Sequence, residues 1–515
     1  MECYKYVSAF LLSVATFTAC FAAGSAVTRP VIPAGSTMPA LKPAAGKVTT
    51  LTTTADGRER LTEGSVRLRK GGATASETLV LDPAKAYQTM DGFGFAITYS
   101  SCYNLLRMSP ADRKAFLRRT YSTTHGYGVS YARISIGCSD FSSTEYSLCD
   151  EPGLEHFALH SDELRYVIPV LREILAINPG LKIIAAPWTC PRWMKVKSLE
   201  SRKPYNHWTD GHLNPDCYDD YALYFVKFVQ AMQQQGISIY AVSPQNEPLN
   251  KGNCASLYMP WQEEADFVAH LAKAFKDNKL ATKIYLYDHN YDYSAMPDQN
   301  DYPVQIYRKL RQTLGDDFDG AELIVGSAYH DYGGNSAELS DVHSQAPDKE
   351  LIFTESSIGT WNDGRNLSVR LMKDMNHLLL STVNQHCKAV LMWNLMLDDK
   401  RGPNLDGGCQ TCYGAVDISS ADYMTITLNS HYYVIAHASS VVRPGAVRIG
   451  VAVQGGEQRD IAYSAFRNTD GTNAIILSNA GSSAQLVTVA DGDRYFQVSV
   501  PSHGVVSCAW VSPRD

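Results

Sequence analysis

The sequence predicts an α/β fold, a (β/α)8 barrel accompanied by a β-sandwich that is formed from both ends of the chain. Between residues 86 and 428, eight short apolar segments alternate with helical patterns, which is typical of a parallel barrel. Residues 429–515 open with a helix at 430–440 and continue as β segments, and residues 48–85 carry a similar β pattern. Because an isolated β segment needs a sheet to join, we expect the two ends to share one sandwich.

The first 47 residues predict an export signal followed by a tether. Lys5 precedes a mostly apolar stretch and small residues follow it, so residues 1–26 resemble a signal peptide, too short for a permanent membrane span. Phe17-Thr-Ala-Cys20 also resembles a bacterial lipobox, so Cys20 is a candidate for acylation, and both processing routes stay open. Residues 27–47 contain four prolines and favour an extended tether. We therefore expect an exported protein, periplasmic or at the cell surface, with possible anchoring through a lipid on Cys20.

The barrel strands are predicted from short apolar runs at residues 92–98, 129–137, 182–187, 239–244, 283–287, 322–329, 350–354 and 389–395. A helix opens at Ser109-Pro110, where a capping serine precedes a proline, and further helices are predicted at residues 162–177, 219–235, 260–279, 304–314 and 367–385. A doubly wound sheet is the alternative, but residues 92–94 lack the glycine-rich phosphate loop that follows its first strand.

The C-terminal segment predicts six β-strands, at residues 447–453, 460–467, 473–479, 485–489, 495–500 and 505–511. Asp470-Gly471 lies between the second and third of them and favours a hairpin turn.

Composition narrows the classes of function. The 515 residues are 45% hydrophobic, enough for a large core, and a net charge of −7 without a basic run argues against a nucleic-acid partner. Most of the 12 cysteines are scattered, although Cys409 and Cys412 are spaced to close a small loop. No second close pair of Cys or His completes a zinc site. We expect no metal and no cofactor, and we place His207, His212 and His289 on the surface or in loops.

Two glutamates, each just past a short apolar run, are the strongest functional signal. Glu247 follows the fourth predicted strand and Glu355 follows the seventh. Active sites of such barrels lie at the carboxyl ends of the strands, and these two positions face each other across the barrel mouth. A protonated carboxyl on one side and an ionised one on the other are what a retaining glycosidase needs. Asn246, directly before Glu247, is positioned to bond a sugar 2-hydroxyl.

Five further segments of the sequence are distinctive: Ser243-Pro-Gln-Asn-Glu-Pro248, Asp91-Gly-Phe-Gly-Phe-Ala96, Arg133-Ile-Ser-Ile-Gly-Cys-Ser-Asp-Phe-Ser142, Pro187-Trp-Thr-Cys-Pro-Arg-Trp193, and Trp393-Asn-Leu395 with Gly402-Pro-Asn404. In these motifs the chain resembles glycoside hydrolase family 30, the glucosylceramidase-like enzymes. The resemblance implies a barrel with a sandwich that contains both termini. It also implies that Glu247 is the acid/base and Glu355 the nucleophile, that Asp140, Trp188, Asn246 and Trp393 line the glucosyl subsite, and that His330 and Tyr332 lie beside the nucleophile.

Two departures from the family pattern concern the sugar. The family often has an acidic residue directly before the tryptophan of strand eight, where this chain has Met392. The corresponding carboxylate is therefore absent or supplied from elsewhere, for example by Asp398 or Asp399. The family's Gly-Gly-Ala is Gly94-Phe-Ala96 here. Structural roles also stay open for individual residues: Asp140 as an ion-pair partner of Arg133, the tryptophans as packing.

These observations predict an exported retaining β-glycosidase that acts by double displacement on a β-glucan or β-glucoside. The export signal, the tether and the lack of an amphipathic lipid-binding segment favour a polysaccharide, so we predict an endo-β-1,6-glucanase. A glucosylceramidase or an exo-acting β-glucosidase is the alternative. A non-catalytic glycan-binding barrel would have lost one of the two glutamates, and both are present.

Overall fold

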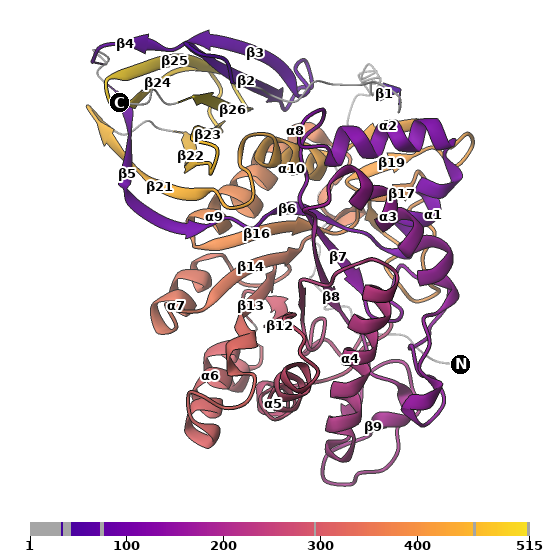
Figure 1. The fold of residues 1–515 in the computed structure, drawn as a ribbon. Coiled ribbons are helices and arrows are strands. Elements are labelled where there is room, and N and C mark those ends of the chain that lie inside the picture. Colours follow the sequence, from indigo (N-terminus) through magenta and orange to yellow (C-terminus); the bar gives the residue numbers. More distant parts are fainter. Residues whose placement is uncertain (1–31, 34–42, 73–76, 293–294, 457–459, 512–515) are drawn as a thin grey trace, which may run out of the picture.

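The computed structural model describes residues 32–33, 43–72, 77–292, 295–456 and 460–511. The predicted signal at 1–26, with Cys20, lies outside these residues. Figure 1 shows a barrel surrounded by helices and a β-domain beside it, in which indigo strands from the N-terminal end lie next to yellow strands from the C-terminal end.

The barrel is closed by eight parallel strands, as the sequence predicts, because the last strand pairs with the first. In ring order they are β6 (Gly92–Ala96), β7 (Tyr131–Ser135), β8 (Lys182–Ala186), β11 (Ala241–Val242), β12 (Lys283–Asn290), β13 (Ile324–His330), β14 (Glu350–Glu355) and β16 (Cys387–Met392). The fourth strand is shorter than predicted, and the fifth runs three residues further.

Side chains fill the interior of the barrel, so it is a packed core and not a pore. The interior cluster is apolar and comes from seven of the strands: Tyr131, Ile184, Ala241, Tyr285, Ala328, Ile352, Ala389 and Leu391. An apolar layer therefore crosses the interior of the barrel.

The helices are α1 (Tyr99–Arg107), α2 (Pro110–Tyr121), α3 (Ile168–Ile177), α4 (Tyr218–Gln234), α5 (Trp261–Asp277), α6 (Tyr302–Leu314), α7 (Ala337–Gln345), α8 (Leu367–Lys373), α9 (Thr382–Asn384) and α10 (Ser430–Val441). The α2 cap is as predicted, since Ser109 Oγ accepts a 3.1 Å hydrogen bond from the Asp112 backbone N–H. Two predicted helices contain π-helical turns, at Glu163–Val167 and Asp374–Ser381. The sequence patterns missed α1 and α7, each nine residues long.

The β-domain is a ten-stranded sheet to which both ends of the chain contribute, which confirms the predicted sandwich. Its strand order is β3 (Thr62–Arg67), β2 (Lys47–Thr54), β26 (Gly504–Val511), β23 (Thr472–Asn479), β22 (Ile461–Arg467), β21 (Val447–Gln454), β5 (Thr78–Thr89), β24 (Gln485–Asp491), β25 (Arg494–Val500) and β4 (Arg69–Lys70). The two ends meet where β2 pairs with β26, from Val48 opposite Trp510 to Thr54 opposite Gly504. Helix α10 contacts both β6 and β26 and so joins the sheet to the barrel.

Small sheets shape the loops at the barrel mouth. Strands β1 (Ile32–Pro33), β20 (Thr425–Leu428), β19 (Val416–Ile418) and β17 (Met396–Asp398) form one of them, so part of the predicted tether pairs with the chain after strand eight. The others pair β9 (Lys195–Val196) with β10 (His212–Leu213), and β15 (Ile358–Gly359) with β18 (Cys412–Tyr413). None of the helices in the described part of the chain is both long and apolar enough to cross a bilayer.

Candidate active site

A cavity of about 280 Å³ opens at the carboxyl ends of the barrel strands. Six of the eight predicted site residues line it, and Asn246 and His330 are buried against them. Its lining is Asp140, Trp188, Glu247, Asn250, Asn253, His289, Asn290, Tyr332, Glu355, Ser357, Trp361, Trp393, Cys409 and Cys412. The three carboxyl groups of the lining therefore come from Asp140, Glu247 and Glu355.

Glu355 is the last residue of β14, and both of its carboxylate oxygens have a donor. Oε2 accepts a 2.5 Å hydrogen bond from Nη1 of Arg133, and Oε1 accepts one of 3.1 Å from the Tyr332 hydroxyl. Burial raises the pKa of Glu355, and the charges of His330 and Arg133 oppose that rise. The two donors hold the carboxyl in one orientation at the floor of the cavity.

Arg133, on β7, is the fully buried centre of this network. Its Nη2 donates 2.7 Å hydrogen bonds to Asn246 Oδ1 and to Asp288 Oδ2. The alternative of an Arg133–Asp140 pair is therefore wrong, because the guanidinium points into the barrel whereas Asp140 lies in the loop that follows β7. Guanidinium charge that serves two carboxylates and one amide fixes their relative positions.

The two predicted tryptophans stack on each other above Arg133. The rings of Trp188 and Trp393 lie 5.0 Å apart at 29°, and the guanidinium carbon lies 5.1 Å and 5.4 Å from their centroids. Both rings are almost fully buried, yet both reach the cavity. They present an aromatic wall next to Glu355, which suits the apolar face of a sugar.

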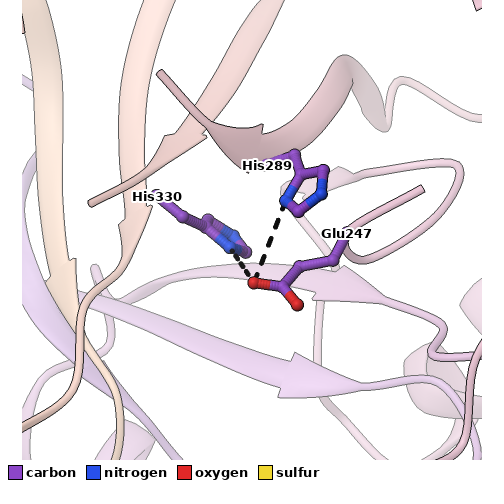
Figure 2. Close-up of side chains that lie close together, drawn as sticks. All are labelled: Glu247, His289 and His330. Atoms are coloured by element: carbon purple, nitrogen blue, oxygen red, sulfur yellow. Dashed lines mark hydrogen bonds and ion pairs between the residues drawn. The ribbon is translucent and has the colours of Figure 1, made fainter. Parts of the chain in front are cut away.

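Glu247 follows β11 with a left-handed φ of +45°, a conformation that side chains rarely adopt. Its Oε2 accepts a 2.7 Å hydrogen bond from Asn250, and its Oε1 lies 3.2 Å from Nδ1 of His330 and 3.9 Å from Nδ1 of His289 (Figure 2). Burial alone would raise the pKa of Glu247, but these partners lower it to about 2. A strained turn thus aims the carboxyl at two imidazoles.

The pKa of Glu247 is the lower of the two, although the resemblance gives this residue the role of acid. His330 explains the difference, because its own pKa is raised to about 9: burial opposes that rise, but Glu355, Asp288 and Glu247 more than offset it. These opposite shifts favour an imidazolium at His330 paired with an ionised Glu247. Since these groups interact strongly, their titration belongs to the cluster and not to single residues.

A bulge in β12 brings Asp288 and His289 into the site. Tyr287 and Asp288 both have positive φ, +74° and +55°, and the register with β13 shifts at this point. Such a bulge redirects side chains. Asp288 turns inward and also accepts hydrogen bonds from His330 Nε2 (3.2 Å) and Thr354 Oγ1 (2.6 Å).

The placement of His289 on the surface is wrong, because the bulge buries it beside Glu247, and burial lowers its pKa to about 4. The apolar run at 283–287 predicts a strand that stops before Asp288 and His289, so neither is among the predicted site residues. The signal was present nonetheless, since both lie just past an apolar run, as the glutamates do. Glu247, His289 and His330 place three possible metal-ligand atoms within 4.8 Å of one another.

Asp140 is held at the cavity by the loop after strand eight. Its backbone oxygen accepts a 3.0 Å hydrogen bond from the Leu405 N–H, and a Cβ at Gly408 would lie only 2.4 Å from that oxygen. Burial, followed by the charge of Glu355, raises its pKa well above the usual range. A disulfide joins Cys409 to Cys412 in the same loop.

Asp398 and Asp399, the candidates to replace the carboxylate that the family often has at the position of Met392, bind backbone N–H groups of loops instead. Asp398 accepts hydrogen bonds from the backbone N–H groups of Lys400 and Gly402, and Asp399 accepts one from Ser420. Neither is part of the cavity lining. Met392 is fully buried in the main apolar core.

Known proteins share both the barrel and the sandwich. The glycosyl hydrolase family 30 TIM-barrel domain matches residues 90–442, and the beta sandwich domain of the same family matches residues 445–508. An endo-1,6-beta-D-glucanase of Trichoderma harzianum is 28% identical over 506 residues, which cover 92% of this chain and 95% of that protein. The lysosomal acid glucosylceramidase of Mus musculus is 25% identical over 490 residues, covering 92% and 90%.

A solved structure is more similar still. The endo-beta1,6-glucanase BT3312 is 55% identical and superposes with a TM-score of 0.85, covering 90% of this chain and all of that one. The family domains account for most of the chain, and the motifs that carry the resemblance lie around the cavity just described. The chain therefore belongs to glycosyl hydrolase family 30 and is a glycoside hydrolase.

Proposed function

We propose that this enzyme is an endo-β-1,6-glucanase that cleaves glucan with retention of configuration. The observation that carries the reaction is the pair of buried carboxyls, Glu247 and Glu355, which line one cavity and are held by different partners. The substrate is inferred from the 55% identity, over nine tenths of the chain, to the endo-beta1,6-glucanase BT3312.

Glu355 is the nucleophile in this proposal. Arg133 and Tyr332 each hold one of its oxygens, so the carboxylate is oriented before substrate binds. It attacks the anomeric carbon and forms a glycosyl-enzyme ester as the glycosidic bond breaks. Tyr332 also contacts Ser357, so the hydroxyl can shift its hydrogen bond when the carboxylate becomes an ester.

Glu247 is the general acid and then the general base. A proton can pass along the 3.2 Å contact between His330 Nδ1 and Glu247 Oε1, from which the carboxyl donates it to the leaving oxygen. In the second step Glu247 takes a proton from the water that hydrolyses the ester. Asp288, bonded to His330 Nε2, orients that imidazole throughout.

The glucosyl unit would lie against Trp188 and Trp393, with Asp140 and Asn246 bonding its hydroxyls. Arg133 holds the amide oxygen of Asn246, which leaves its NH2 group to serve the sugar. Trp361 is a further platform, at the rim: it lines the cavity and is 52% exposed. Its ring lies on Gly359, where a Cβ would come within 1.9 Å of it. An exposed ring held in this way is suited to stack against the next glucose unit of a glucan chain.

The role of each glutamate is tested by azide rescue of alanine variants on an activated aryl β-glucoside. Glu355→Ala should lose turnover by several orders of magnitude and form the inverted α-glucosyl azide when azide is added. Glu247→Ala, the matched control from the other side of the bond, should form the retained β-glucosyl azide. If the Glu355 variant gave the β-azide and the Glu247 variant the α-azide, the two roles would be reversed. Near-normal activity of either variant would show that the replaced glutamate is not catalytic.

Glucosylceramide is the second candidate substrate, because the mouse lysosomal glucosylceramidase is similar along 92% of this chain. Product analysis from a β-1,6-glucan and from glucosylceramide in detergent decides between them. Release of short β-1,6-linked oligosaccharides supports the proposal, whereas glucose alone indicates exo action and cleavage of the lipid indicates a glucosylceramidase.

Export to the periplasm or cell surface is part of the same proposal, since a polymeric glucan lies outside the cell membrane. Its support is the sequence of residues 1–26. Mass spectrometry of the mature N-terminus, together with palmitate labelling of the wild type and of Cys20→Ser, distinguishes signal cleavage from lipid anchoring.

A further inference from the structure

We propose that Glu247, His289 and His330 form an inhibitory site for a divalent transition-metal ion, zinc above all, at the floor of the catalytic cavity. We call these three residues the Glu–His–His site. The ligand of this site is a metal ion and not a sugar, so metal binding can be tested without any substrate.

The ligand atoms of the Glu–His–His site already converge. Glu247 Oε1 lies 3.2 Å from His330 Nδ1 and 3.9 Å from His289 Nδ1, and all three atoms lie within 4.8 Å of one another. Figure 2 shows both rings turning a nitrogen toward the same carboxylate oxygen. Tetrahedral zinc with bonds of about 2.0–2.1 Å needs ligand atoms about 3.3 Å apart. The His330–Glu247 pair has that spacing, whereas His289 Nδ1 is 3.9 Å from the carboxylate oxygen and must move closer.

Two of the three ligands, His330 and Glu247, are also held by further hydrogen bonds. His330 Nε2 is bonded to Asp288 Oδ1, the carboxylate–histidine arrangement that orients metal-binding imidazoles. Asp288 is in turn held by Arg133 and Thr354, and the second oxygen of Glu247 by Asn250. The three ligand residues are at most 6% exposed, so their rotamers are restricted by packing. Besides a shift of side chains, the ion must displace the proton on Nδ1 of His330, so zinc binding should strengthen as pH rises.

The site has an access route and a selective ligand set. Glu247 and His289 line the cavity, so an ion can enter from the substrate side and keep a water as its fourth ligand. Two imidazole nitrogens and one carboxylate suit Zn²⁺, Cu²⁺ and Ni²⁺, whereas Mg²⁺ and Ca²⁺ prefer oxygen ligands. The bound ion would occupy the oxygen of Glu247 that must donate the proton, so it inhibits hydrolysis.

Isothermal titration of chelator-treated enzyme with ZnCl2 and, separately, with MgCl2 tests the site. We expect one zinc per chain, no magnesium binding, and loss of hydrolysis that EDTA reverses. His289→Gln and Glu247→Gln remove ligands from two different strand ends, and each should weaken zinc binding by at least about tenfold. His125→Gln, the replacement of an exposed loop histidine, is the matched control and should bind zinc like the wild type.

The calorimetric readout is independent of activity, so it separates this site from the proposed function. If one of the two ligand variants fails to fold, as judged by circular dichroism, the other still decides. Unchanged zinc affinity in a folded His289→Gln or Glu247→Gln variant would overturn the proposal. So would zinc binding that is weakened only by His125→Gln, or no binding to the wild type.

Discussion

Replacing Glu264 by glutamine should stabilise the enzyme at pH 8 and change its stability little at pH 5. Glu264, on α5, is fully buried, and its Oε1 accepts a 3.0 Å hydrogen bond from the backbone N–H of Tyr287, the first residue of the β12 bulge. Burial raises the pKa of Glu264 to about 7 from an ordinary 4.5, although the Tyr287 hydrogen bond opposes that rise. Ionisation of this buried carboxyl above pH 7 therefore lowers the free energy of unfolding.

The magnitude follows from the pKa difference between the two states. Because the pKa is higher in the folded protein than in the unfolded chain, the stabilisation from protonated Glu264 is complete below about pH 4.5 and is lost as pH rises through about 7. A difference of about 2.5 pKa units corresponds to about 3 kcal/mol. Glutamine stays neutral and avoids this loss. Its oxygen can accept from Tyr287, and its NH2 group can donate to the Tyr302 hydroxyl, whose own proton goes to the Met259 carbonyl.

Differential scanning calorimetry of both proteins from pH 5 to pH 8 measures the effect. The Tm of Glu264→Gln minus that of the wild type should rise with pH and reach a few degrees in favour of the variant at pH 8. Glu163→Gln is a second test, since burial also raises the pKa of Glu163 to about 7. A Tm difference that stays constant or falls as pH rises would refute the reasoning.

Three further predictions concern the cavity. Arg133→Lys should lower kcat by about 10- to 100-fold, because one ammonium cannot hydrogen-bond Glu355, Asp288 and Asn246 together. Steady-state kinetics of the folded variant measures this effect, and a near-normal kcat would contradict the prediction. Trp361→Ala should raise KM about tenfold for β-1,6-glucan but hardly for a small aryl β-glucoside, and equal effects on both would show that the ring is not a polymer platform. Replacing Cys409 and Cys412 by serine should cost about 2 kcal/mol, seen as a lower Tm. It should also raise KM by loosening the loop that holds the cavity rim, and an unchanged KM would show that the loop keeps its shape without the disulfide.

Local sequence patterns were sufficient for most of the fold and for the two glutamates. A buried parallel strand appears in the sequence as a short apolar run, and a residue directly after such a run lies at the carboxyl end of the barrel. Glu247 and Glu355 could be found in this way because both lie just past apolar runs in the sequence. The helices α1 and α7 could not be predicted from the sequence. Nine residues make too few turns to give a clear periodic pattern.

The rest of the site depends on contacts between distant segments. The β12 bulge inverts two φ angles and turns Asp288 and His289 inward, and its stabilising partner, Glu264, lies on the preceding helix. Arg133 bonds residues from three other strand ends, which no spacing in the sequence reveals.

The sequence by itself determined the architecture, the family and the position of the two carboxyls, because these follow from short-range apolar patterns and motifs. Only the tertiary structure decided what surrounds each carboxyl: Arg133 and Tyr332 at Glu355, His330 and His289 at Glu247. The physical reason is that the protonation and orientation of a buried acid depend on the charges and hydrogen-bond donors within a few ångströms of it. In a barrel those neighbours come from strands that are far apart along the chain.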